Sequence, residues 1–251
     1  MTPTRWRVAV TRDEGESGPL SAALRAEGFD ARLCPVFDER PPTNLSPLLN
    51  AAAHLDEFDW VICASARAVR AIVETRQRPW PSAVRTAAVG GGTATALADA
   101  GAVRPFVAGD AGARALWAAL ATEDRWMGRR VLIPTVKGGR EELIDGLRAA
   151  GAAVTVVEAY AMEPRAIGEI AATWQAIEPR GAIVVSPSVA SRLTEAVGTA
   201  ALQTLDTVVA MGATTAASLG TLGVRCTMPP AADFPSIARH LAAIRASRVG
   251  M

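Results

Sequence analysis

Short apolar runs alternate with longer Ala- and Leu-rich stretches along the chain. Most of the short runs are continuous rather than alternating, which is typical of strands buried on both faces of a parallel sheet. The longer stretches predict helices, so the sequence indicates an α/β fold built from repeated strand–helix units. The predicted strands cover residues 7–11, 30–36, 60–64, 86–89, 103–107, 131–134, 154–157, 182–185, 207–211 and 224–228.

The first predicted helix covers about residues 19–27. Ser17 suits the N-cap, Pro19 suits the first turn, and Gly28 suits the C′ position.

The pattern occurs twice. Residues 8–28 resemble residues 131–151, and residues 59–101 resemble residues 180–223. Equivalent positions are 121 to 123 residues apart, as the pairs Ser65/Ser186, Gly90/Gly212 and Val8/Val131 show. A near-constant offset over four segments predicts two related α/β lobes with a cleft between them. Residues 36–42 and 158–164 occupy equivalent places and end in proline, so we expect them to be extended inter-lobe linkers.

Composition narrows the possible functions. Half of the 251 residues are hydrophobic, only 5% are aromatic, and the formal charge is +1. That charge argues against a general binder of nucleic acids or membrane surfaces, which needs a basic excess. The sequence shows no signal-like apolar start and no apolar run long enough to span a bilayer, so we expect a cytoplasmic protein. The three cysteines lie far apart and predict buried free thiols in a reducing compartment.

Six short loops follow predicted strands and precede predicted helices, where open α/β sheets bind ligands. Each alone reads as an N-cap or a tight turn, but at symmetric positions their amides and hydroxyls predict anion binding. The candidate binding residues in these loops are Arg12, Ser65, Arg67, Gly90, Thr93, Lys137, Gly139, Arg140, Ser186, Ser188, Thr214 and Thr215.

Two side chains occur once each. Lys137 is the only lysine, and it suits either an anion site or a solvated surface. Tyr160 is the only tyrosine and lies in a predicted linker, where its phenol could donate a proton or simply pack. We find no metal-ligand cluster, Ser/His/Asp pattern or Walker A motif in the sequence. The run from Gly90 imitates a dinucleotide fingerprint, but Thr95 stands at its third glycine position.

With these residues assembled, the chain resembles the uroporphyrinogen-III synthase family over nearly its whole length. The resemblance rests on V-T-R at residues 10–12, the two strand-and-serine runs at residues 61–69 and 183–191, and the two G-x-x-T-A helix starts at Gly90 and Gly212. It also rests on G-R-E at residues 139–141 and V-x-x-Y-x-x-x-P at residues 157–164.

The resemblance implies two similar lobes with parallel sheets flanked by helices, joined by a two-stranded β-ladder linker. Lobe one would combine residues 1–36 with 165–251, and lobe two would be the insert 42–158. The linkers would be residues 37–41 and 159–164.

It also implies a lyase of porphyrin and heme biosynthesis that closes hydroxymethylbilane to uroporphyrinogen III, with loss of water and inversion of ring D. Tyr160 would be the catalytic residue, and the loop residues named above would bind the tetrapyrrole substrate. No cofactor and no metal are expected. We expect a monomer that contacts hydroxymethylbilane synthase only transiently and binds neither nucleic acid nor membranes.

Two alternatives stay open from the sequence. One is a non-catalytic or regulatory two-lobe binding protein of the same fold. The other is a nucleotide-dependent enzyme that uses the glycines at residues 90–92.

Overall fold

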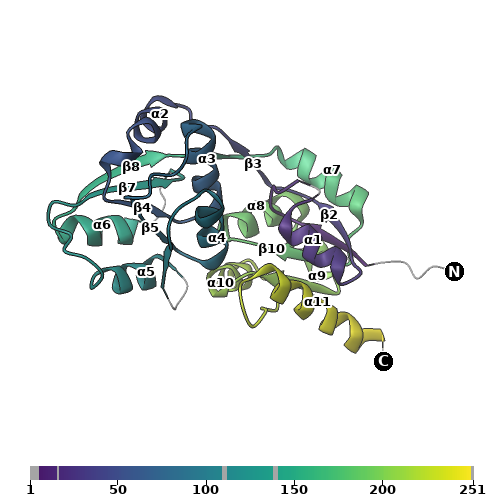
Figure 1. Cartoon of the computed structure of the whole chain (residues 1–251). Coiled ribbons are helices and arrows are strands. Elements are labelled where there is room, and N and C mark those ends of the chain that lie inside the picture. Colours follow the sequence, from purple (N-terminus) through teal and green to yellow (C-terminus); the bar gives the residue numbers. More distant parts are fainter. Residues whose placement is uncertain (1–5, 16, 109–111, 138–140, 250–251) are drawn as a thin grey trace. The chain divides into compact units, whose positions relative to one another are not determined.

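The computed structural model describes residues 6–15, 17–108, 112–137 and 141–249. The chain divides into two compact units (Figure 1). Unit 1 comprises residues 1–38 and 163–251, and unit 2 comprises residues 39–162. The division falls inside two strands that pair with each other, β3 (Phe37–Arg40) and β9 (Ala161–Pro164). Unit 2 is therefore inserted into the sequence of unit 1.

Unit 2 holds a five-stranded parallel sheet in the order β6-β5-β4-β7-β8. Strand β4 lies at its centre, and all four of its residues are buried because helices cover both faces. The strands are β4 (Trp60–Cys63), β5 (Arg85–Ala88), β6 (Phe106–Val107), β7 (Arg130–Thr135) and β8 (Ala153–Glu158). The helices are α2 (Ser46–Ala53), the 3-10 turn η1 (Leu55–Glu57), α3 (Ala66–Arg76), α4 (Gly91–Asp99), α5 (Ala113–Leu120) and α6 (Glu141–Ala149).

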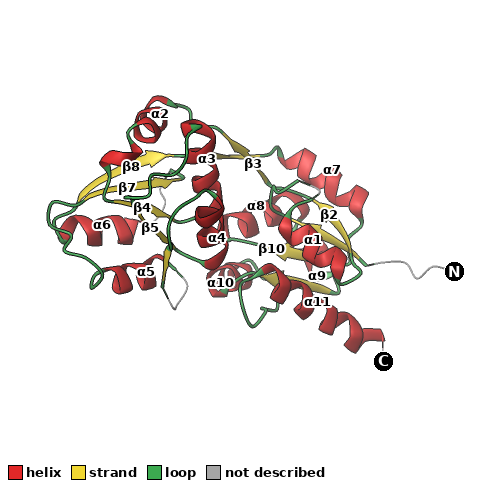
Figure 2. Ribbon diagram, in the orientation of Figure 1, coloured by secondary structure: helices red, strands yellow, loops and turns green. Residues whose placement is uncertain are grey.

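Alternate residues of β4, β5 and β7 enter different cores. Val61 and Cys63 of β4 pack with α2, α3 and α4, whereas Trp60 and Ile62 pack with α5 and α6. Figure 2 shows the sheet strands of this unit between their helices. The continuous apolar runs in the sequence are explained by this two-sided burial.

Unit 1 has a four-stranded parallel sheet in the order β11-β10-β1-β2. One core joins it to α7, α8, α9 and α10, and another joins it to α1 and α11. The strands are β1 (Arg7–Val10), β2 (Asp30–Leu33), β10 (Gly181–Val184) and β11 (Thr207–Ala210). The helices are α1 (Pro19–Ala26), α7 (Ile167–Ile177), α8 (Pro187–Val197), α9 (Thr199–Gln203), α10 (Ala213–Thr221) and α11 (Phe234–Val249).

The two sheets repeat one arrangement, and the predicted fold class is confirmed. In strand order, β5-β4-β7-β8 of unit 2 corresponds to β11-β10-β1-β2 of unit 1. The register repeats as well, since Val10 pairs with Leu33 and Ile133 pairs with Val156. Each residue of the second pair lies 123 positions after its counterpart in the first pair.

The strand expected at residues 30–36 ends at Leu33, and two other predicted strands lose most of their length in the structure. The strand expected at residues 103–107 is reduced to β6, because Arg104 has φ of 46° and Pro105 follows it. The strand expected at residues 224–228 is reduced to one isolated bridge, Val209–Thr227, and a proline pair ends the run shortly afterwards. Both segments lie beside the equivalent strands β5 and β11, so they are the same weak edge in the two units.

The predicted N-cap Ser17 is wrong. Gly18 holds the N-cap position of α1, and the side chain that caps this helix is Glu14. Its carboxylate accepts hydrogen bonds from the Ser21 amide at 2.6 Å and from the Leu20 amide at 3.3 Å. A carboxylate supplies the negative charge that a helix N-terminus favours. Gly28 ends the helix with φ of 80°, as predicted.

Candidate functional site

The predicted binding residues that the structure describes follow the carboxyl ends of parallel strands. In unit 2, Ser65 follows β4, Gly90 follows β5, Lys137 follows β7 and Tyr160 follows β8. Because these strands are neighbours in one parallel sheet, the four positions share one edge. We call it the carboxyl edge of unit 2. Gly139 and Arg140 lie outside the described residues.

Ser65 and Tyr160 are brought together although 95 residues separate them. The Ser65 hydroxyl oxygen lies 3.2 Å from the Tyr160 hydroxyl oxygen. Ser65 is also the N-cap of α3, and its Oγ accepts a hydrogen bond from the Ala68 amide at 3.2 Å. With that oxygen already accepting, the Ser65 hydroxyl is able to donate toward the phenol. Tyr160 is half-buried and packs against the core beneath α2, α3 and α4, which fixes its ring.

Arg67 lies in the first turn of α3, and an acidic side chain already engages it. Its Nε lies 2.7 Å from a carboxylate oxygen of Glu39, and the Met162 sulfur lies 3.8 Å from its Nη1. The same Glu39 carboxylate binds Arg70 at 2.8 Å. The guanidinium is therefore partly neutralised before any substrate arrives, and no local sequence pattern indicates this pairing.

The glycines that open α4 have room around them. A Cβ placed on Gly90, Gly91 or Gly92 would meet no heavy atom within 4 Å, and none of the three has a positive φ. Neither packing nor backbone geometry therefore demands glycine here. Helix N-termini leave their first amides without intrahelical partners, so exposed Gly91 and Gly92 lie where a helix start is chemically suited to an anion. Thr93 is buried beneath it.

Lys137 is exposed and lines a cavity of about 470 Å³ between α6 and the carboxyl ends of β7 and β8. The cavity has mixed charge, because Arg148 lines it together with three carboxylates. These are Glu141, Asp145 and Glu158.

Unit 1 presents the equivalent edge with different side chains. Ser186 is the N-cap of α8, accepts a hydrogen bond from the Val189 amide at 3.3 Å, and lies 3.0 Å from the hydroxyl of Ser188. Thr214 is exposed at the start of α10, whereas Thr215 is buried.

Arg12 follows β1 in unit 1 and lies 3.3 Å from Glu14, the residue that caps α1. The Glu14 side chain is only 2% exposed. The Arg12 guanidinium also lies 4.9 Å from the centre of the Phe234 ring. Like Arg67, this predicted anion-binding arginine is already paired with a carboxylate of its own unit.

The described residues contain no cluster of three or more side chains that could hold a metal ion. Burial raises the pKa of Cys34 to about 11, partly opposed by Arg165, and burial raises the pKa of Cys63 to about 12. Both thiols are therefore protonated and unreactive near neutral pH. The two edges of the described chain carry hydroxyls, amides, a few cations and, around Lys137, three carboxylates.

A sequence model of the family "Uroporphyrinogen-III synthase HemD" matches residues 18–239, which is most of the chain. This chain belongs to the uroporphyrinogen-III synthase family. The resemblance drawn from the sequence motifs is thereby confirmed.

Named members of the family match at moderate identity. The chain is 36% identical to uroporphyrinogen-III synthase of Synechococcus elongatus over 160 residues, which cover 61% of this chain and 59% of that protein. It is 30% identical to uroporphyrinogen-III synthase of Escherichia coli K12 over 193 residues, which cover 74% and 78% of the two chains. The matched part thus spans about three fifths of the first relative and over three quarters of the second.

Solved structures of two synthases share the fold. A mutant synthase of the extreme thermophile Thermus thermophilus matches with a TM-score of 0.66 at 19% identity, covering 96% of this chain and 99% of that one. The enzyme of Helicobacter pylori 26695 matches with a TM-score of 0.60 at 15% identity, covering 95% and 98%. At these identities the matches support the fold rather than individual site residues.

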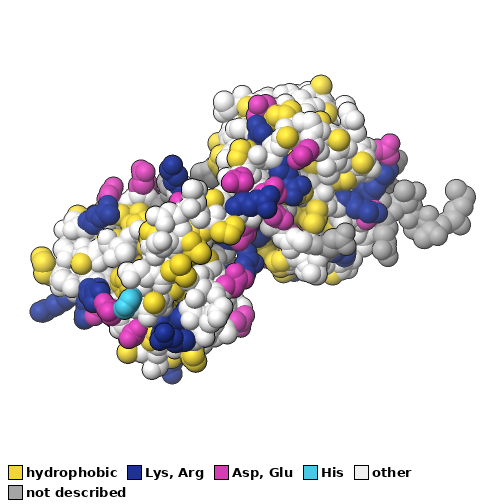
Figure 3. Space-filling model, turned by 90° about the horizontal axis from the view of Figure 1, so that it is seen from above, with side chains coloured by type: hydrophobic (Ala, Val, Ile, Leu, Met, Phe, Trp, Pro, Cys, Tyr) yellow, Lys and Arg dark blue, Asp and Glu magenta, His cyan; other side chains and the backbone are white. Residues whose placement is uncertain are grey.

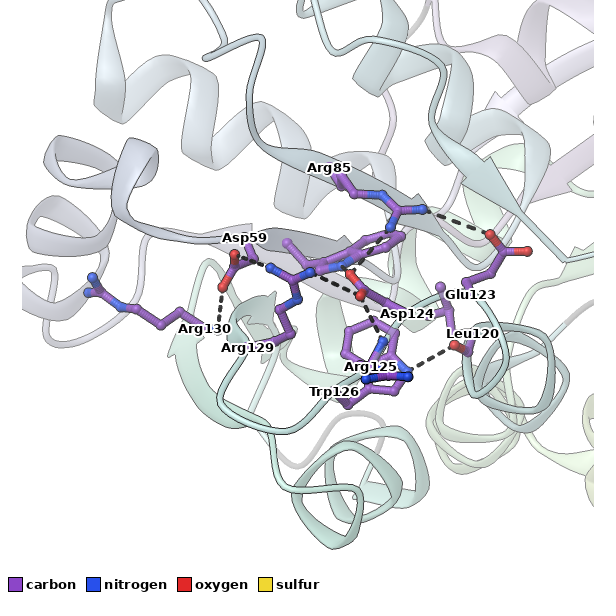
Figure 4. A network of polar contacts seen from close by, with 10 residues as sticks. Asp59, Arg85, Leu120, Glu123, Asp124, Arg125, Trp126, Arg129 and Arg130 are labelled. Atoms are coloured by element: carbon purple, nitrogen blue, oxygen red, sulfur yellow. Dashed lines mark hydrogen bonds and ion pairs between the residues drawn. The ribbon is translucent and has the colours of Figure 1, made fainter.

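In this synthase-family chain, a second polar cluster lies at the opposite, amino edge of the unit 2 sheet (Figure 4). Asp124 accepts a hydrogen bond from Trp60 Nε1 at 3.0 Å and pairs with Arg129 at 3.1 Å and Arg85 at 3.3 Å. The Arg85 guanidinium lies 4.1 Å from the centre of the Trp60 ring. Burial acts to raise the pKa of Asp124, but the hydrogen bonds from Trp60 and Arg129 outweigh it and lower that pKa. We call this the Asp124 network.

The face of the molecule that Figure 3 shows has no large patch of a single charge among the described residues. Lys and Arg side chains are interspersed there with Asp and Glu side chains among the described residues. No described helix is long and apolar enough to cross a bilayer.

Proposed function

We propose that this chain catalyses the family reaction, closure of hydroxymethylbilane to uroporphyrinogen III with loss of water and inversion of ring D. The observation that carries the proposal is the Ser65–Tyr160 hydroxyl pair at the carboxyl edge of unit 2. Family membership and the named relatives support the same activity.

Tyr160 is the proposed general acid. Its O–H gives a proton to the terminal hydroxyl of the substrate, which leaves as water while the pyrrole nitrogen supplies the electron pair. The products of this step are water, a cationic azafulvenium that keeps its pyrrole N–H, and the Tyr160 phenolate. Ser65 stabilises the phenolate by donating its hydroxyl hydrogen bond across the 3.2 Å contact.

Ring closure then needs positioning more than acid or base strength. The free bilane can close without inversion, so the enzyme must hold the chain for attack through the spiro intermediate. The final return to aromatic pyrroles releases one proton, and the Tyr160 phenolate is the proposed acceptor. The sum of the steps is loss of one water with the tyrosine restored, and no cofactor is required.

The substrate carries eight carboxylates, and we propose that both carboxyl edges bind them. The first amides of α4, at exposed Gly91 and Gly92, and hydroxyls that face solvent suit this role better than arginines already paired with Glu14 or Glu39. The proposed binding residues remain Arg12, Ser65, Arg67, Gly90, Thr93, Lys137, Gly139, Arg140, Ser186, Ser188, Thr214 and Thr215. Monomeric action, transient contact with hydroxymethylbilane synthase and a cytoplasmic location stay predictions.

A coupled assay tests the activity. Porphobilinogen and hydroxymethylbilane synthase generate the substrate, and the oxidised porphyrins are separated by isomer. We expect isomer III to dominate when the chain is present. Isomer I at the level of the reaction without it would refute the proposed function and leave a binding protein of the same fold.

A further inference from the structure

Glu39 connects β3 to the start of α3 through two arginines. One carboxylate oxygen lies 2.7 Å from Arg67 Nε, and the other lies 2.8 Å from Arg70 Nη2. Arg67 and Arg70 are three residues apart on α3 and so lie on one face of the helix. The Glu39 side chain is 24% exposed and that of Arg67 is 21% exposed, so solvent screens their pair only in part.

The Glu39 carboxylate offsets an unfavourable charge at the start of α3. A cation in the first turn of a helix opposes the helix dipole, and α3 carries no acidic residue in its first turn. Glu39, which lies on strand β3, brings a negative charge to that end of the helix. Without it, two arginines would lie together at one end of α3.

The same helix end holds the Ser65–Tyr160 pair. Ser65 is the N-cap of α3 and stands two positions before Arg67. On the other side, the Met162 sulfur that Arg67 contacts at 3.8 Å lies two positions after Tyr160. Arg67 is therefore close to Ser65 along α3, contacts the segment that follows Tyr160, and pairs with Glu39.

We infer that Glu39 is a positioning residue for the reaction, which holds the α3 start so that Ser65 and Tyr160 stay in hydrogen-bond contact. This inference rests on the proposed function, because it gives Tyr160 its role. In this inference Glu39 acts through its pair with Arg67.

The test is Glu39→Gln, which keeps the shape of the side chain and removes its charge. We expect turnover to isomer III to fall about ten-fold with KM changed less than about two-fold, because a small misplacement of the acid affects the reaction step rather than binding. Glu57→Gln is the matched control. Glu57 pairs with Arg130 at 2.8 Å, and this pair lies away from Tyr160. We expect the control to keep wild-type turnover.

A double variant shows whether Glu39 acts through Tyr160. In a Tyr160→Phe background, Glu39→Gln should lower turnover less than about two-fold, since the hydroxyl that it positions is gone. An undiminished ten-fold loss in that background would overturn the inference. Full activity of Tyr160→Phe alone would instead refute the role of Tyr160 in the proposed function, so the two failures are distinguishable.

A spectroscopic readout keeps the inference testable even if activity is lost for other reasons. The chain has one tyrosine, so ring-labelled tyrosine gives NMR signals from Tyr160 alone. Glu39→Gln should shift these signals in the same direction as Ser65→Ala, and Glu57→Gln should not. Unmoved tyrosine signals in a folded Glu39→Gln protein would overturn the inference. A variant that unfolds is replaced by Arg67→Gln, for which the same signal shift is required.

Discussion

Tyr160 in unit 2 and Phe37 in unit 1 occupy equivalent positions after the edge strands β8 and β2, 123 residues apart. Both rings pack against the core of their unit, but only Tyr160 carries a hydroxyl, which meets Ser65. Ser186, the counterpart of Ser65, caps its helix in the same way and contacts the hydroxyl of Ser188 instead. The duplicated backbone thus provides two similar edges, and single side-chain differences place the proposed acid–base chemistry on one of them.

The largest expected effect comes from giving position 160 the same side chain as its counterpart Phe37. Tyr160→Phe should lower the rate of isomer III formation about 100-fold, the low end of the range for a general acid, because the pyrrole nitrogen still assists departure of the hydroxyl. Thermal unfolding should change little, since the ring remains in its core. The isomer assay measures the rate, and a fully active variant would remove Tyr160 from the mechanism.

The two capping serines form the next test. Ser65→Ala and Ser186→Ala should each lower the free energy of unfolding by about 1 kcal/mol through loss of the N-cap. Only Ser65→Ala should also lower turnover, by about ten-fold, because it removes the partner of the phenolate. Ser186→Ala should act mainly on KM. Equal losses of turnover in both variants would contradict the assignment of the chemistry to unit 2.

The Asp124 network extends the comparison to the two edges of one sheet. Asp124→Asn should lower the free energy of unfolding by about 1.5–3 kcal/mol, because a largely buried carboxylate with charged partners is lost. Turnover of the folded protein should stay near wild type, because the network lies at the amino edge. Denaturant unfolding and the isomer assay measure the two effects separately.

The Asp124 network also predicts that the stability of the protein depends on pH. The pKa of Asp124 is lowered in the folded protein, so its contribution to stability is present above the unfolded value of about 4 and is lost as pH falls through the folded value. The wild-type protein should therefore lose its stability advantage over Asp124→Asn on acidification below about pH 4. Urea midpoints of both proteins against pH provide the measurement, and parallel curves would contradict it.

The smallest effect is expected at Gly92, whose counterpart in unit 1 is Thr214. Gly92→Ala should raise the free energy of unfolding by about 0.5–1 kcal/mol, since α4 gains helix propensity and the added Cβ meets no atom within 4 Å. If the open amides bind a substrate carboxylate, KM should rise at the same time. A stabilised variant with unchanged KM would place substrate binding elsewhere.

Local patterns predict most of the framework. Continuous apolar runs locate eight of the ten predicted strands, and the repeat offset anticipates the matching sheet orders. The two strands that lose most of their length lie at edges where few cross-strand contacts support them, and proline or a positive φ decides the outcome locally.

The missed residues share a different property. Glu39 reaches α3 across 28 and 31 positions, and Asp124 reaches Trp60 across 64. Such pairings depend on the folded path of the chain and leave no periodic signal in the sequence. The capping role of Glu14 has a local signal in the sequence, since an acidic residue shortly before the Gly18-Pro19 helix start is a sign of a capping carboxylate.

The insertion of unit 2 into unit 1 has a consequence for biosynthesis. Unit 2 is one uninterrupted stretch, so all its strands are made before β10 leaves the ribosome. Strand β1, however, pairs Val8 with Gly181, and it must wait with one edge open until the chain has been made to that point. Unit 1 therefore completes its sheet last, and truncated or slowly translated chains expose the second edge of β1, which is prone to aggregation until β10 pairs with it.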